Sequence, residues 1–186
     1  MNHDFTSFPV LETERLTLRE LNLDDAKAIF GLRTNKEVNE FIDRKIPRNL
    51  SEARAFIDLI SKLSSNEKGI FWVIESKSSH QLIGTIGLRH FDDEDEDDYA
   101  ELGYELDPTY QQRGYMSEAF EEVLNFGFKN LELKTVEAFT HKNNTAFTHK
   151  NNTASIALLE KLKFVLHPDR RDEGFENNRS YRLENA

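Results

Sequence analysis

The chain has 186 residues, enough for one ordinary domain with its own core and too few for two comfortable ones. Apolar residues make up 38% and charged residues 31%, as in soluble globular proteins, and the absence of Cys excludes disulfides, a thiol nucleophile and cysteine metal ligands. A net charge of -10 argues against nucleic acid as a main partner, because phosphate binding needs clustered Lys and Arg.

Targeting and metal-binding patterns are also missing from the sequence. It has no apolar run of roughly eighteen residues, and its first ten residues, MNHDFTSFPV, lack the basic region and apolar stretch of a signal peptide. We therefore expect a cytoplasmic protein with no membrane partner. The six His are scattered without the spacing of metal ligands, so we expect no metal.

Residue patterns in the first half predict one strand, two helices and then three strands. RLTLRE (15–20) alternates polar and apolar residues, as a strand does. Apolar residues at helical spacing predict helices over 24–33 and 51–62, the second with Ser51 as its N-cap. The β-rich runs that follow are 70–76 and 81–91, which a KSSH turn joins into a hairpin, and 99–106, which Asp107-Pro108 ends.

The second half continues with a helix over 117–129, a strand over 135–140, a helix over 155–162 and two strands, near 164–166 and 179–183. The whole order is β-α-α-β-β-β-α-β-α-β-β. It predicts an α/β (α+β) fold in which a mixed sheet carries helices on both faces.

Seven consecutive acids, Asp92 to Asp98, follow the predicted hairpin. Adjacent like charges repel each other and cannot be buried, which favours a solvated loop. The alternative is an electrostatic funnel that attracts a protonated amine and weakens with salt.

The segment richest in chemistry is ELGYELDPTYQQRGYMSEAF, residues 101–120, where a strand runs through a loop into a helix. Gly114 permits close approach of the backbone, and the N-terminus of the helix presents unpaired N–H groups with partial positive charge. Together with Arg113 they would form an anion site that fits a pyrophosphate. The alternative is an ordinary strand-loop-helix connection, because short glycine motifs recur by chance. The residues expected to contact the anion are Gln111, Gln112, Arg113, Gly114, Tyr115, Met116 and Ser117.

The sequence resembles the GNAT superfamily of N-acetyltransferases, especially its RimJ/RimL-like branch. The resemblance runs through ETERLTLREL, LIGTIGL, AELGYELDPTYQQRGYMSEA and NTASIALLEKLKF. The pyrophosphate motif of the family is Gln/Arg-x-x-Gly-x-Gly/Ala, and Gln111, Gly114 and Met116 occupy its fixed positions. Met116 departs from the small residue, but its backbone N–H is retained.

The resemblance implies one GNAT-like domain over residues 1–186, with a centrally splayed sheet that holds acetyl-CoA as co-substrate and needs no metal. The backbone N–H near Leu106 would polarise the thioester carbonyl for direct transfer to an amine. Glu101, at the start of the strand, would remove the proton from the amine, and Glu105, on the same face, is the reserve. The alternative for Glu101 is a solvated or salt-bridged strand residue.

The C-terminal family pattern, Asn-x-x-Ser before a helix, is matched by Asn152 and Ser155. By this resemblance Asn152 holds the pantetheine amide, while Ser155 caps the helix and lies near the sulfur. Some relatives have a Tyr general acid at the position of Leu159, which cannot donate a proton. Ser155 or water is therefore the expected proton source.

An eight-residue unit, AFTHKNNT, occurs twice in succession over residues 138–153. True repeat architectures need at least three larger units, so this is a segmental duplication within the strand-to-helix connection. We expect a monomer or homodimer, with a domain swap through the extra residues as one possibility. The acceptor would be an amine-bearing small molecule, such as a polyamine, or a protein N-terminus. The alternatives are a non-catalytic acyl-CoA-binding module impaired by the duplication, and an acidic interaction protein.

Overall fold

Eight strands form one sheet in the order β1-β2-β3-β4-β5-β6-β8-β7. The structure is a computed structural model that describes residues 8–42, 44–66, 68–89, 98–141, 152–168 and 178–185. Neighbouring strands are antiparallel except for β5 and β6, which are parallel. The strands are β1 (Leu11–Glu12), β2 (Leu16–Glu20), β3 (Gly69–Ser76), β4 (Gln81–Arg89), β5 (Tyr99–Leu106), β6 (Thr135–His141), β7 (Val165–His167) and β8 (Asn178–Glu184).

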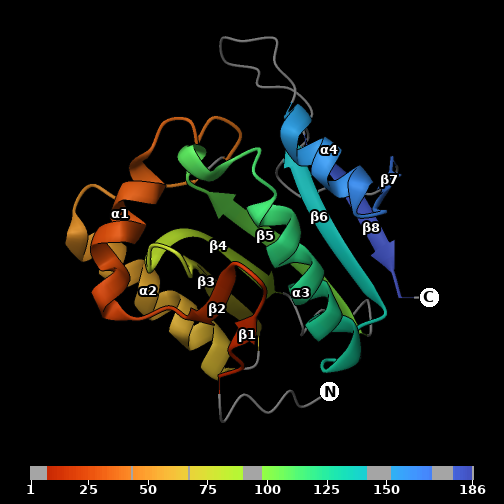
Figure 1. The fold of residues 1–186 in the computed structure, drawn as a ribbon, viewed down its shortest axis with the longest axis horizontal. Coiled ribbons are helices and arrows are strands. Elements are labelled where there is room, and N and C mark those ends of the chain that lie inside the picture. The colour runs from red at the N-terminus through yellow and green to blue at the C-terminus, as the bar shows by residue number, and fades with distance from the viewer. Residues whose placement is uncertain are drawn as a thin grey trace.

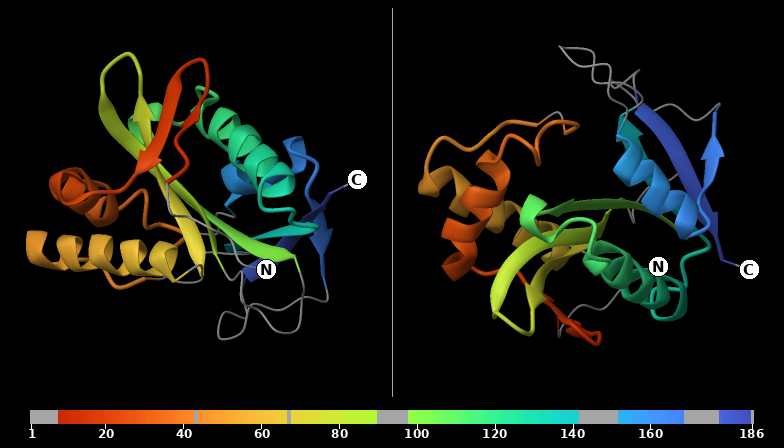
Figure 2. Two further views of the ribbon diagram at one scale, coloured as in Figure 1. Left: turned by 90° about the horizontal axis from the view of Figure 1, so that it is seen from below. Right: turned by 45° about the horizontal axis from the view of Figure 1, so that its top comes forward.

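Helices cover both faces of this sheet (Figures 1 and 2). Two lie on one face, α1 (Ala26–Thr34) and α2 (Leu50–Ser65), and two on the other, α3 (Tyr115–Lys129) and α4 (Thr153–Lys161). Short 3-10 helices, η1 (Leu23–Asp25) and η2 (Pro108–Tyr110), precede α1 and α3. The predicted mixed sheet with helices on both faces is confirmed.

Alternation along β3 gives each face its own core. Trp72 and its neighbours two residues away join the apolar cluster that contains Phe120 of α3. Val73 points the other way and packs with Ile29 of α1 and Ile57 of α2. A strand with a period of two can supply both cores because successive side chains leave opposite faces.

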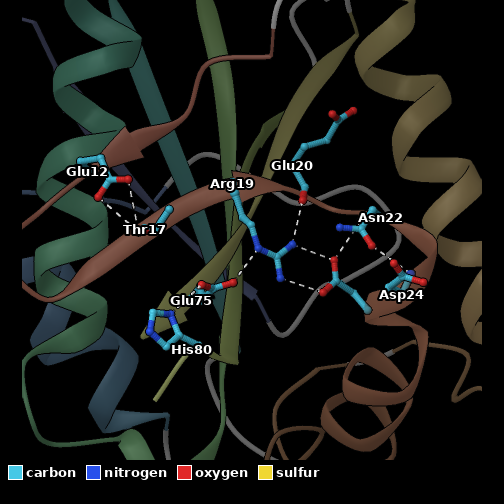
Figure 3. Close-up of polar contacts among 9 residues, drawn as sticks. Glu12, Thr17, Arg19, Glu20, Asn22, Asp24, Glu75 and His80 are labelled. Atoms are coloured by element: carbon cyan, nitrogen blue, oxygen red, sulfur yellow. Dashed lines mark hydrogen bonds and ion pairs between the residues drawn. The ribbon is translucent and has the colours of Figure 1, made fainter. Parts of the chain in front are cut away.

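Arg19 of β2 joins the start of α1 to the sheet (Figure 3). Its guanidinium donates to Glu75 of β3 at 2.7 Å and to both carboxylate oxygens of Asp25 at 2.8 and 2.9 Å. Asp25 also accepts from the backbone N–H of Asn22, which completes a capping box around η1. The hydrogen bond to Asp25 raises the pKa of Arg19 above its ordinary value.

The element order matches the predicted one, with β1, η1 and η2 added. Helix starts differ. The N-cap of α2 is Asn49 rather than Ser51, because the Asn49 side chain accepts from the N–H of Glu52 at 3.0 Å. The N-cap of α4 is Asn152, so the expectation that Ser155 caps this helix was wrong. Apolar spacing marks the interior of a helix, whereas its first residue depends on a local hydrogen bond.

Two predicted features lie largely outside the described residues. Of the acidic run, only Asp98 is described, and it pairs with Lys134 at 2.7 Å. Of the duplicated unit, residues 138–141 end β6 and residues 152–153 begin the turn into α4.

Candidate functional site

Strands β5 and β6 pair over a short stretch and then separate. The parallel pairing covers Tyr99 with Thr135, Ala100 with Val136 and Glu101 with Glu137. Beyond these residues the two strands diverge, and only β6 runs towards α4 (Figure 1). The sheet is therefore split at its centre, where the resemblance to GNAT proteins predicts a cofactor.

The register of β5 against β4 orients its backbone towards this opening. The N–H of Asp107 donates to the carbonyl of Ile83 at 2.8 Å, so odd-numbered residues of β5 bond to β4. In an antiparallel ladder the alternate residues direct their N–H and C=O groups the other way. Tyr104 and Leu106 therefore turn their N–H groups towards β6, and the oxyanion role expected of Leu106 stays a prediction.

The first turn of α3 begins at Gly114, directly after the loop that follows β5. Gly114 is the N-cap, with φ 80° and ψ 0° in the left-handed region, and no side chain caps the helix. The first N–H groups of a helix have no internal partner, and here they belong to Tyr115, Met116 and Ser117. Gln111, Gln112, Arg113 and Gly114 are exposed, whereas Tyr115 to Ser117 have buried side chains.

Three cationic side chains surround this first turn. The guanidinium groups of Arg15 and Arg113 lie 4.4 and 5.2 Å from the centre of the Tyr115 ring. Lys161 of α4 donates to the hydroxyl of Ser117 at 2.9 Å. Sequence reasoning selected only Arg113, because the other two come from distant segments. Arg113 and Lys161 therefore bring positive charge to this turn, whereas the charge of Arg15 is compensated by Glu118.

Glu118 fixes the position of Arg15. The guanidinium of Arg15 pairs with the Glu118 carboxylate at 2.6 Å, and the Arg15 backbone N–H donates to it at 2.9 Å. Burial acts to raise the pKa of Glu118, but hydrogen bonds from Thr13 and Arg15 outweigh it and leave that pKa below its ordinary value. The start of α3 is consequently anchored to the segment before β2.

Replacing Gly114 by Ala should destabilise the protein by about 1–2 kcal/mol, because a residue with a Cβ is strained in the left-handed region. A Cβ here would meet only the Arg15 side chain at 3.4 Å, an ordinary contact, so the cost comes from the backbone. Urea unfolding measures it. Gly31→Ala is the control. A Cβ at Gly31, in α1, would meet nothing within 4 Å, so Ala should stabilise that helix by about 0.5–1 kcal/mol. Equal stability of Gly114→Ala and wild type would contradict the strain.

Tyr104 and Ser155 connect β5 to α4 across the opening through a contact between their hydroxyl groups. The Tyr104 ring packs edge-on against Phe120 of α3, with 4.6 Å between the ring centres. Burial raises the pKa of Tyr104 to about 12, so the phenol keeps its proton at neutral pH. Sequence reasoning missed Tyr104, although its alternation with Glu101 and Glu105 places it on the α3 face.

Asn152 is the N-cap of α4. Its side-chain oxygen accepts from the backbone N–H of Ser155 at 3.2 Å. The amide nitrogen of Asn152 is the remaining polar group of this side chain, and it could donate to a pantetheine carbonyl. Leu159, where some relatives have Tyr, is fully buried in the core on the α3 side.

The two candidate carboxylates share the face of β5 opposite to α3, as the period of two predicted. Glu101 pairs with Arg89 of β4 at 2.9 Å. Glu105 accepts from the Thr85 hydroxyl at 3.2 Å and is engaged by arginines from outside the sheet. Four residues of a strand separate them by about 13 Å, and Glu101 is the last residue of β5 that pairs with β6.

The described residues contain no group of three or more His, Cys, Asp or Glu that could hold a metal ion. In that same part of the chain, none of the helices has the length and apolar character needed to cross a membrane.

Comparison with known proteins identifies the family. The family model for the acetyltransferase (GNAT) domain matches residues 15–165. The chain belongs to the GNAT acetyltransferase family. It is also 33% identical, over 94% of its length and 93% of the relative, to the uncharacterized N-acetyltransferase YoaA of Bacillus subtilis (strain 168).

Solved GNAT structures share the fold. The ribosomal-protein-S5-alanine acetyltransferase from Vibrio fischeri matches with a TM-score of 0.77 at 19% identity, covering 95% of this chain and 97% of that one. RimL, a ribosomal L7/L12 alpha-N-protein acetyltransferase in complex with coenzyme A, matches with a TM-score of 0.76 at 15% identity, covering 95% and 98%. The predicted GNAT fold and the predicted class, an acetyl-CoA-dependent N-acetyltransferase, are confirmed.

Proposed function

We propose that this GNAT family member transfers the acetyl group of acetyl-CoA directly to a primary amine of a small molecule or a protein N-terminus. The observation that carries the proposal is the opening between β5 and β6, into which the N–H groups of Tyr104 and Leu106 point. The hydrogen bond from Lys161 to Ser117 brings the first turn of α3 beside the end of α4, and we assign the anion site to this turn. Acetyl-CoA carries a thioester and a pyrophosphate, so it needs backbone donors for the thioester carbonyl and an anion site for the pyrophosphate.

In this proposal the loop before α3 and its first turn hold the cofactor phosphates. The N–H groups of Tyr115, Met116 and Ser117 bind the pyrophosphate, and Gly114 allows the backbone to approach it. Met116 acts through its backbone, because its side chain is buried in the core. The exposed residues Gln111, Gln112 and Arg113 line the outer side of the same loop.

Lys161 is an additional phosphate contact in this scheme, because its ammonium group already lies 2.9 Å from the Ser117 hydroxyl. Asn152 would hold the pantetheine through its side-chain amide nitrogen while its oxygen caps α4. Cofactor binding would therefore draw on α3 and α4 at once.

The reaction forms a C–N bond and breaks the C–S bond of the thioester. An amine with a pKa near 10 is about 0.1% neutral at pH 7, so a base that removes its proton is useful. We assign this role to Glu101, acting through bound water, because it lies about 16 Å along β5 from Leu106 and cannot reach an amine bound there directly. The N–H of Leu106 stabilises the oxyanion, and that of Tyr104, about 7 Å away along the strand, donates to the pantetheine.

The departing thiolate needs a proton, and we assign its supply to Ser155, whose hydroxyl contacts that of Tyr104. Tyr104 retains its proton at neutral pH because burial raises its pKa to about 12. Ser155 would give its hydroxyl proton to the sulfur and regain one from water, while Tyr104 stays protonated and orients the Ser155 hydroxyl. The acceptor then reaches the thioester from the carboxylate face of β5.

Calorimetric titration with acetyl-CoA tests the proposal, using the full chain and a variant that lacks residues 138–145. The deletion leaves a single AFTHKNNT, whose first four residues repeat those that end β6. We expect both proteins to bind acetyl-CoA with Kd values within about tenfold of each other, because the strand sequence is preserved.

Three other outcomes are informative. Binding by the shortened variant alone would mean that the duplication obstructs the site. Absence of binding by both would overturn the proposal. Binding without acetylation of any amine in a broad panel would favour the non-catalytic acyl-CoA-binding module.

A further inference from the structure

Two arginines and one glutamate form a largely buried cluster on the face of β5 opposite to α3. Glu105 pairs with Arg33, the penultimate residue of α1, at 3.4 Å and with Arg44 of the segment between α1 and α2. The side chains of Arg33, Arg44 and Glu105 are 15%, 12% and 4% exposed. Two guanidinium groups against one carboxylate leave this cluster with one net positive charge.

The hydrogen-bonding capacity of Arg44 is not used up. Its Nε donates to the side chain of Asn39 at 2.7 Å, and its Nη1 contacts Glu105. Its Nη2 is buried and has no hydrogen-bond partner among the residues that the structure describes. A buried charged donor without an acceptor is unfavourable, so an acceptor that arrives with a ligand would satisfy it.

Arg33 is held beside Arg44 by packing as well as by charge. Its guanidinium lies 3.8 Å from the centre of the Phe56 ring of α2. Burial lowers the pKa of Arg33, partly offset by Glu105. A rigid pair of guanidinium groups is thereby held close below the surface, with only a small part of each side chain exposed.

The position of the cluster relates it to the reaction. Glu105 lies in β5 between Tyr104 and Leu106, the two residues whose N–H groups face the opening. With the cofactor on the side of α3, the amine approaches from the face on which Glu105 and the arginines lie. A group of the acceptor a few bonds from the amine would then meet the arginine pair.

We propose that Arg44, supported by Arg33, binds a carboxylate of the acceptor, so that the acceptor is a primary amine that also carries a carboxylate. This inference rests on the proposed acetyl transfer. A guanidinium offers two parallel N–H groups that match the two oxygens of a carboxylate, which favours this group over a neutral one. The cluster is cationic, whereas the whole chain has a net charge of -10. An acceptor that carries a carboxylate and an ammonium group is attracted by the cluster and by the chain, respectively.

The test measures binding without turnover. Protein saturated with CoA is titrated with N-acetylated ω-amino acids of increasing chain length, each compared with its own carboxamide. For the best length, wild type should bind the carboxylate at least about tenfold more tightly than the carboxamide, as expected for charged hydrogen bonds. Arg44→Gln should reduce this ratio to about one, and Arg44→Lys, which keeps the charge without the fork, should lie between.

Arg48→Gln is the matched control, since Arg48 belongs to the same segment and pairs with Glu52 on the surface. It should retain the wild-type ratio. Equal binding of carboxylate and carboxamide by wild type at every length would overturn the inference without any variant. So would an unchanged ratio in Arg44→Gln.

Acetylation of the free ω-amino acids, their carboxamides and a diamine separates this inference from the proposed function. Preference for the amino acid supports both. Preference for the diamine or the carboxamide overturns the inference and leaves acetyl transfer standing. Discrimination in binding with no acetylation of any amine supports the carboxylate site and overturns the proposed activity.

Discussion

Exchanging Glu101 for Gln should lower kcat for acetyl transfer by about 10²–10⁴ at neutral pH, the usual contribution of a general base. The amide has the shape of the carboxylate but cannot accept the proton of the amine. The defect should narrow as the pH rises towards the pKa of the amine, near 10, because the substrate then loses its proton to solvent. Steady-state rates across this pH range, at saturating acetyl-CoA, measure both effects.

Glu101→Gln should leave folding almost unchanged, which makes the kinetic result interpretable. Its partner Arg89 has a half-exposed side chain, and exposed ion pairs contribute at most about 1 kcal/mol to stability. Glu52→Gln, which removes a surface pair with Arg48, is the control for losing a charge and should keep full activity. If the kcat of Glu101→Gln at neutral pH were within about twofold of wild type, Glu101 would not be the base, and another group or water would have that role.

Local patterns were sufficient for the framework of the site. The bounds of β5 were predicted correctly because a polar acidic run precedes it and Asp107-Pro108 ends it. Its period of two placed Glu101 and Glu105 on one face. The loop before α3 and the start of this helix were predicted because Gly114 marks a backbone conformation that other residues avoid.

Contacts between distant segments could not be predicted in this way. Arg15 lies 103 positions from Glu118, and Lys161 lies 44 positions from Ser117, yet both contact the first turn of α3. Which side chains meet across such separations depends on the packing of the sheet and its helices. No spacing rule within one segment contains that information.

The N-cap of α4 and the contact of the Tyr104 hydroxyl could not be predicted for a related reason. The sequence places Ser155 next to a helix start but does not show whether Asn152 or Ser155 is the N-cap, since both residue types favour that position. Tyr104 was overlooked because an aromatic residue in a strand is usually a core residue, and only the fold brings its hydroxyl to Ser155. Proton transfer is thus the part of the site that depends most on three-dimensional structure.

Replacing Glu105 by Gln should destabilise the protein by about 3–5 kcal/mol, far more than the same change at Glu101 on the same face of β5. Glu105 is almost fully buried and compensates two guanidinium groups, so its loss leaves both without a counter-charge. Urea unfolding of the two single variants measures the difference, with Glu101→Gln as the matched control.

A triple variant identifies the origin of that loss. Adding Arg33→Met and Arg44→Met to Glu105→Gln removes the uncompensated charges while keeping apolar volume, and most of the lost stability should return, because buried ion clusters are often replaced by apolar side chains at little cost. A loss below about 1 kcal/mol for Glu105→Gln would indicate that water already solvates the cluster. A triple variant no more stable than Glu105→Gln would instead assign the loss to packing around Glu105. Recovery in the triple variant, together with loss of the preference for carboxylates, would show that the charges in this cluster serve recognition of the acceptor more than folding.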